Sequence, residues 1–214
     1  MSKQTSFIDY PEFDEAKTTF LVSENAEKKM TFMTPIYNYQ LNKSNRLYVA
    51  TPFMQINSHL HWDIIKNKCS ITVSLAELDF SPILGFISKY DDTIKNKLDN
   101  KTISTNNNNK IKFHLKLENG KILSDVTNYN ISKKYPKVEK INDVANLNLK
   151  FSKGKHVRFL LKPSVWVNKI GDTFGSFFEI EKMEIKYSKA TVDSEFDKDT
   201  WEYTSIPNNI KIEI

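Results

Sequence analysis

Residues 151–185 combine basic and aromatic side chains within two stretches of β-like sequence. Residues 150–169 contain no carboxylate, and the next acid along the chain is Asp172. Lysine and arginine attract phosphates, and aromatic rings stack on unpaired bases, so this combination suits a single-stranded nucleic acid. The candidate contacts in this segment are Lys153, Lys155, Arg158, Lys162, Trp166, Lys169 and Phe177. A weaker instance of the same combination consists of Lys133, Lys134 and Tyr135.

The same residues also fit an ordinary pair of strands. Aromatic residues in strands usually pack in a core, and lysines on the opposite face are usually just solvated. Arg158 and Lys162 share one face of the expected strand, whichever explanation holds. The coincidence of cations, aromatic residues and missing acids in one region favours a binding surface over simple solvation.

Alternation leaves the orientation of the aromatic residues partly open. Trp166 follows Pro163, where a bulge would shift the register, so Trp166 fits either the face of the lysines or the core. Phe177 and Phe178 are neighbours and must point to opposite faces of their strand. We therefore expect one of these two phenylalanines to be exposed.

Histidines offer the main alternative chemistry. His59 and His61 are two residues apart, which on a strand places both on one face, and Asp63 or Cys69 could be a third metal ligand. The plainer interpretation is a polar loop, because no motif with metal-ligand spacing is present. Cys69 lies on the apolar face of its expected strand, which favours a core residue over a nucleophile. We expect no enzyme activity, no metal and no cofactor.

Composition limits the class of protein. The formal net charge is +5 and the pI is about 9.0, which mildly favours polyanionic partners. A single cysteine excludes a disulfide framework within the chain, so we expect an intracellular, reducing compartment. No apolar run approaches the roughly 18 residues of a membrane-spanning helix, so no membrane partner is expected.

Hydrophobic periodicity predicts a mainly β fold. Period-two alternation and turn signals predict strands at residues 46–54, 69–75, 111–117, 157–167 and 173–185. An Asn-Gly turn at residues 118–121 predicts a hairpin. One amphipathic helix is expected at residues 81–98. This order suggests an OB-like antiparallel β-barrel with one principal helix and long loop extensions, and a β-sandwich remains the alternative.

Three segments are expected along the chain. Residues 1–45 form an N-terminal extension that packs on the core, residues 46–190 form the OB-like core, and residues 191–214 form an acidic C-terminal segment. Residues 193–203 have the acidic, aromatic-containing character of a tail that recruits replication proteins. Residues 210–214 alternate like a strand, so the acidic stretch could equally be a loop.

The order of several short motifs resembles that of a known family. These are LYVATPFM at residues 47–54, SLAELDF at 74–80 ahead of the helix, KGKHV at 153–157, SVW at 164–166 and FGSFF at 174–178. Together they are similar to motifs of the single-stranded DNA-binding proteins of large cytoplasmic DNA viruses, the African swine fever virus type. The resemblance spans roughly residues 46–187.

The resemblance implies an OB-fold core that coats single-stranded DNA during viral replication, repair or recombination, without a cofactor. It places Trp166 and its flanking cations at or near the DNA groove. The implied location is the host cytoplasm, at sites of viral replication, or the virion. The rival hypothesis is a structural or scaffold protein that uses exposed aromatics as a protein interface and forms a stable oligomer. A metal-dependent enzyme at His59 and His61 ranks third, and self-association stays open.

Overall fold

The computed structural model describes residues 7–25, 27, 29–40, 43–56, 60–63, 65–74, 81–98, 103–104, 110–132, 135–151, 155–168, 170 and 172–186. These residues form a mainly β protein, as expected, with two α-helices among the described elements. In these ranges, neither helix has the length and apolar character needed to cross a bilayer.

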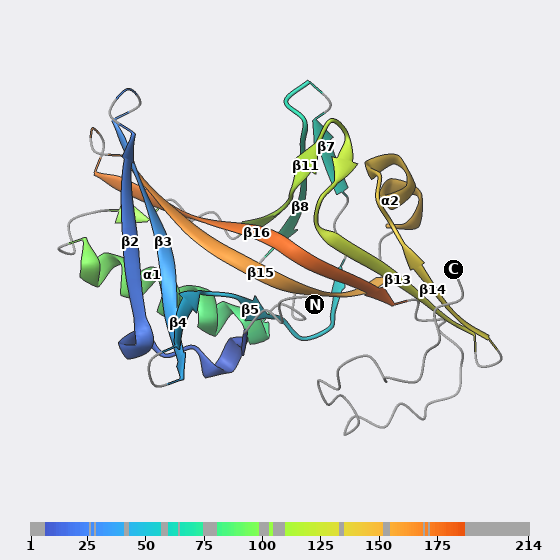
Figure 1. The fold of residues 1–214 in the computed structure, drawn as a ribbon, viewed down its shortest axis with the longest axis horizontal. Coiled ribbons are helices and arrows are strands. Elements are labelled where there is room, and N and C mark those ends of the chain that lie inside the picture. Colours follow the sequence, from blue (N-terminus) through green and yellow to red (C-terminus); the bar gives the residue numbers. More distant parts are fainter. Residues whose placement is uncertain are drawn as a thin grey trace.

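A long antiparallel strand pair forms the centre of the fold (Figure 1). β15 (Lys155–Asn168) and β16 (Thr173–Lys186) follow the two expected β stretches and pair along their length. The outer edge of β15 pairs in turn with β6 (Met54–Ile56), β5 (Val49–Ala50) and β3 (Met30–Gln40). The outer edge of β16 pairs, in parallel, with β13 (Asp125–Ser132), β10 (Lys110–Leu115) and β9 (Ile103–Ser104).

Further strands extend the sheet outward from these edges. On the β15 side they are β2 (Thr18–Asn25) and β4 (Lys43–Arg46), both on β3, and β1 (Ile8–Asp9) on β5. On the β16 side they are β8 (Lys68–Ser74) on β10, β7 (Leu60–Asp63) on β8, and β14 (Tyr135–Lys140) on β13. The predicted Asn-Gly hairpin is confirmed: β11 (Leu117–Glu118) and β12 (Lys121–Ile122) join through Asn119 and Gly120, both with positive φ.

The described pairings form an open sheet. The hydrogen-bonded path begins at β1 and ends at β7, and no described strand pairs these two ends to close a barrel. In Figure 1 the β2–β3 hairpin rises on one side of the β15–β16 pair, and β7, β8 and β11 rise on the other. The sheet is therefore strongly curved, with one concave side.

The principal helix covers the opposite side. α1 (Ser81–Lys97) matches the expected helix. Most of its predicted apolar stripe is buried, namely Ile83, Phe86, Ile87, Tyr90 and Ile94, whereas the last member, Leu98, is half-buried just beyond the helix. Phe178 packs against Phe86 and Tyr90, with ring centroids 6.3 and 6.1 Å apart. Burying such a side chain contributes about 1.5–3 kcal/mol, so this helix–sheet contact is a main source of stability. The second helix, α2 (Val144–Lys150), follows β14 and is capped by the Asp143 carboxylate.

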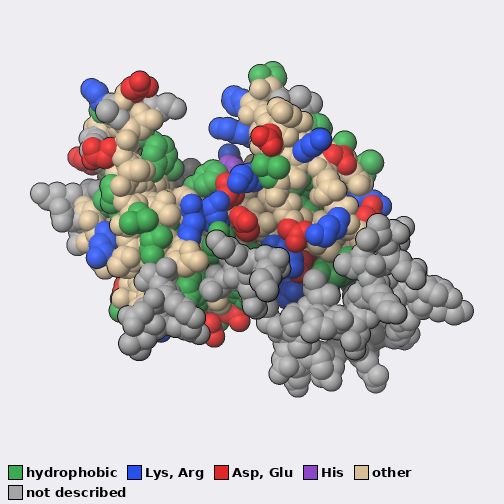
Figure 2. Space-filling model, viewed as in Figure 1, with side chains coloured by type: hydrophobic (Ala, Val, Ile, Leu, Met, Phe, Trp, Pro, Cys, Tyr) green, Lys and Arg blue, Asp and Glu red, His purple; other side chains and the backbone are tan. Residues whose placement is uncertain are grey.

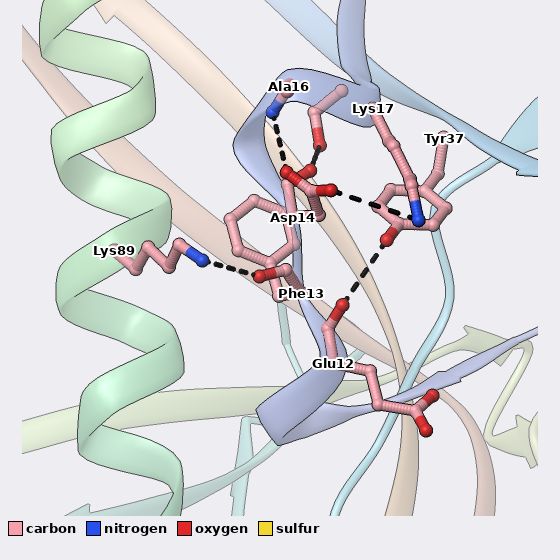
Figure 3. A network of polar contacts seen from close by, with 8 residues as sticks. Glu12, Phe13, Asp14, Ala16, Lys17, Tyr37 and Lys89 are labelled. Atoms are coloured by element: carbon pink, nitrogen blue, oxygen red, sulfur yellow. Dashed lines mark hydrogen bonds and ion pairs between the residues drawn. The ribbon is translucent and has the colours of Figure 1, made fainter.

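The N-terminal residues belong to the same core. Two short 3-10 helices, η1 (Tyr10–Glu12) and η2 (Glu15–Lys17), flank Phe13, which is 2% exposed and packs edge-on against Phe86. Lys89 of α1 donates a hydrogen bond to the Phe13 carbonyl at 2.8 Å, and Tyr37 of β3 donates to the Glu12 carbonyl at 3.3 Å (Figure 3). Residues expected as an extension thus supply strands to the main sheet and a side chain to its core.

Candidate nucleic-acid interface

The concave face is the face of the sheet opposite α1, and on β15 it consists of the even-numbered residues. These side chains are half-buried, whereas the odd-numbered ones from Val157 to Val167 are buried. Alternation continues through Pro163, because the register shift lies earlier, at Leu160 and Leu161. Trp166 therefore lies on the same face as Arg158 and Lys162, which settles the orientation that the sequence left open.

The two neighbouring phenylalanines occupy opposite faces. Phe178 is 1% exposed and belongs to the core, whereas Phe177 is half-buried on the concave face. The Phe177 ring stacks on the imidazole of His114, with centroids 4.3 Å apart and planes inclined by 18°. Of the two candidates, Phe177 is thus the one with an accessible ring.

Two of the expected phosphate contacts are already ion-paired. Strand register places Glu184 opposite Arg158 and Glu179 opposite Lys162, and each pair forms a salt bridge. Lys182 adds a second contact to Glu184 at 2.9 Å. The acid-free stretch of sequence is therefore not an acid-free surface, because β16 brings carboxylates to it.

The salt bridges of Glu184 change the pKa of its carboxyl group. Burial alone would raise the pKa of the Glu184 carboxyl. The hydrogen bond and charge of Arg158, together with Lys182, outweigh burial and lower that pKa below its ordinary value of 4.5. A phosphate could engage Arg158 only by competing with this carboxylate.

Several expected contacts fall outside the described side chains. Lys133, Lys134, Lys153 and Lys169 lie outside the described residues. The backbones of Lys155 and Tyr135 begin β15 and β14, and their side chains are not described.

Cations that face the concave side without a carboxylate partner come from other strands. Lys112 of β10 and Lys68 of β8 are exposed, and neither has a salt bridge within the described part of the chain. Both lie close enough to His114 to influence its titration. Neither Lys112 nor His114 was among the candidate contacts, although period-two alternation over residues 111–117 does place both on the polar face of their strand. The sequence did not reveal that this strand lies beside Phe177.

Phe32 completes the aromatic part of the surface. It lies on β3 directly opposite Trp166, and 42% of it is exposed. On its other side Trp166 faces Gly175, which has no side chain to cover the indole. No ring among the described residues stacks on Trp166, and its side chain is half-buried.

These residues form a line across five adjacent strands, which we call the cross-sheet row. It consists of Phe32, Trp166, Phe177, His114, Lys112 and Lys68, on β3, β15, β16, β10 and β8. Four steps of about 4.8 Å between strands give the row an extent of roughly 19 Å measured across the strands. One end is aromatic and the other is cationic.

The space-filling view shows the same division. In Figure 2 the molecule is hollowed between two arms, the β2–β3 hairpin on one side and the β7–β8 region on the other. Hydrophobic side chains gather on the β2–β3 wall, and lysine and arginine side chains gather on the facing wall. The hollow thus joins an apolar wall to a positive one.

Of the two histidines in the alternative chemistry, His61 lies within the described residues. His61 pairs with Ser70 and Trp62 pairs with Cys69, so His61 and Cys69 point to opposite faces of the β7–β8 pair. Cys69 is 1% exposed, and burial raises the pKa of its thiol to about 12. His59 lies outside the described residues. Among those described, no three His, Cys, Asp or Glu side chains cluster in a way suited to a metal ion.

Comparison with known proteins adds no further constraint. The chain matches no protein-family model and no curated protein sequence.

Proposed function

We propose that this protein binds single-stranded DNA along the cross-sheet row, without strong sequence preference. The observation behind this proposal is that partly exposed aromatic rings lie at one end of the cross-sheet row, and lysines without a salt bridge to any described carboxylate lie at the other. Phosphates would bind Lys112 and Lys68, with release of counterions. Bases would stack on Phe177, Trp166 and Phe32, at about 1–3 kcal/mol per base.

The geometry favours a single strand over a duplex. The rings lie on β3, β15 and β16, on the concave face of the sheet, where they can meet only bases that are unpaired and turned toward the sheet. Stacking uses the face that every base possesses, so it gives little sequence preference. A duplex would present phosphates to the lysines but would leave the aromatic residues without partners.

The wider setting is also a proposal. An OB-like relationship is supported by the resemblance over residues 46–187 and by the curved antiparallel pair with a helix packed beneath it. From that resemblance we infer a role in viral DNA replication, repair or recombination in the host cytoplasm. Recruitment of replication proteins through residues 191–214 concerns a segment outside the described residues.

One observation favours the rival scaffold function. β2 pairs only with β3 among the described strands, and its central residues Leu21 and Val22 are 64% and 60% exposed. Exposed apolar side chains on an unprotected edge strand are typical of protein association sites. This function predicts a stable oligomer with weak nucleic-acid binding.

One experiment separates the two functions. Fluorescence anisotropy with labelled oligo(dT) and with a duplex of equal length, across a salt series, should show tighter binding to the single strand. Affinity should fall linearly as salt rises on a double-logarithmic plot. Equal, feeble binding to both nucleic acids, together with an oligomer in light scattering, would favour the scaffold function instead.

A further inference from the structure

His114 occupies the junction between the aromatic and cationic ends of the cross-sheet row. Its ring stacks on Phe177, so the imidazole plane is held nearly parallel to a phenyl ring 4.3 Å away. In register it lies opposite Ser70 of β8 and beside Glu179 of β16. A phosphate attached to a base stacked near Phe177 would therefore pass directly over this histidine.

The charged and titratable groups on the face of His114 come from five strands, and they include Lys116 just beyond its own strand and, across Ser70, His61 of β7. Lys112 is on its own strand and Lys68 is on β8, while Glu179 of β16 is bound to Lys162 of β15. Partial burial, and then the charges of Lys112 and Lys68, lower the pKa of His114 below its ordinary value of 6.5, although Glu179 opposes them. These surroundings therefore favour the neutral imidazole in the free protein.

An anion bound between the lysines would reverse this balance. A phosphate within about 4–6 Å of an imidazole favours its charged form and commonly shifts such a group by 1–3 pKa units. The stacked Phe177 ring would add a favourable cation–π contact to the imidazolium. The same site would thus hold three cationic groups when occupied and two when empty.

We propose that Lys68, Lys112 and His114 form a phosphate-binding site in which His114 takes up a proton when the phosphate binds. This inference rests on the proposed function, since the phosphate is taken to be that of single-stranded DNA. By linkage, a ligand that prefers the protonated protein binds more tightly as pH falls. Affinity is then lowest above the pKa of His114 in the complex and highest below its pKa in the free protein.

The test is oligo(dT) affinity between about pH 8 and pH 6 at constant ionic strength. For the wild type we expect affinity to rise several-fold over this range, as part of the about tenfold gain that a one-unit shift gives once pH is below the pKa of His114 in the free protein. His114→Gln and His114→Phe should both lose this dependence, whatever their absolute affinity. The matched control is His156→Gln on β15, at the far end of the concave face, which should keep it. A flat wild-type profile, or an unchanged slope in both His114 variants, would overturn the proposal.

A second measurement on the wild type avoids dependence on the variants folding. NMR titration of the His114 imidazole should give a pKa below 6.5 in the free protein and a raised value with inorganic pyrophosphate or oligo(dT). Absence of oligo(dT) binding at every pH would contradict the proposed function. The titration with pyrophosphate would then still show whether Lys68, Lys112 and His114 bind a phosphate. A His114 pKa unmoved by pyrophosphate would overturn the inference separately.

Discussion

The two halves of the β15–β16 pair share one buried face, yet their concave surfaces differ in kind. Near the turn, the described concave side chains are uncharged and include Ser164, Trp166 and Phe177. Toward the other end, Arg158 and Lys162 of β15 form salt bridges with Glu184 and Glu179 of β16. We call the half near the turn the aromatic half, because its rings face the concave side. We call the other the ion-paired half, because its cations form salt bridges within the protein.

This difference indicates where binding can be favourable. A partly buried ion pair must be broken before either member can serve a ligand, and the carboxylate left behind then lacks a partner. Lys112 and Lys68 carry no such penalty, because no described carboxylate pairs with them. The aromatic half lies beside Lys112 of β10 and Lys68 of β8. These two lysines make it a better surface for a polyanion than the ion-paired half, although the ion-paired half has more cations in its sequence.

The largest expected effect comes from removing the rings of the aromatic half. Trp166→Ala and Phe177→Ala should each weaken oligo(dT) binding by about 1–3 kcal/mol, or roughly fivefold to 150-fold. The matched control is Phe53→Ala in the ion-paired half, where Arg158 and Lys186 already cover the ring at 4.8 and 4.1 Å from its centroid. Fluorescence anisotropy measures all three variants.

The proposed difference between the two halves is wrong if Phe53→Ala weakens oligo(dT) binding as much as Trp166→Ala and Phe177→Ala do. That outcome would place the DNA over the ion-paired half, and Arg158 would then have to exchange Glu184 for a phosphate. Strong binding by all three variants would retain the function and remove the cross-sheet row from it.

A smaller effect should separate the two sets of cations. Lys68→Gln with Lys112→Gln should reduce the slope of log affinity against log salt by about 2, because two phosphates would no longer be neutralised by a lysine. Lys162→Gln should leave that slope unchanged and should instead lower thermal stability, because Glu179 loses its partner. Anisotropy gives the slopes, and circular dichroism melting gives the stabilities.

The reverse pattern would be decisive against this assignment. A reduced slope in Lys162→Gln, with no change in the double variant, would show that DNA displaces the ion pair. The acid-free sequence segment would then be the contact surface after all.

The sequence was sufficient to predict the strands and their buried face. Period-two alternation predicts Val157, Phe159 and Leu161 as core residues, and each is at most 1% exposed. The stripe on α1 is confirmed in the same way, with Tyr90 and Ile94 fully buried. These predictions depend only on local periodicity, which a pleated strand or a helix enforces directly.

The surface could not be predicted because it depends on register and strand order. Glu179 is 17 residues from Lys162, and Glu184 is 26 from Arg158, so only the pairing of β15 with β16 shows that these charges meet. The cross-sheet row draws on five strands, with Phe32 far from Lys112 in sequence. No local pattern shows that β3 and β10 lie on either side of one strand pair.

The smallest expected effect is on the free energy of unfolding. It tests whether the salt bridge between Arg158 and Glu184 stabilises the ion-paired half. Because the pKa of Glu184 is depressed, its stabilisation should be present above the ordinary value of 4.5 and lost as pH falls through the folded-state pKa. Glu184→Gln should therefore cost about 1 kcal/mol at pH 7 and progressively less as pH falls below 4.5 and then through the folded-state pKa, by urea unfolding. Glu181→Gln, at an exposed position on the same strand, is the control and should change neither value. An equal cost at both pH values would mean that Glu184 acts through packing and not through its charge.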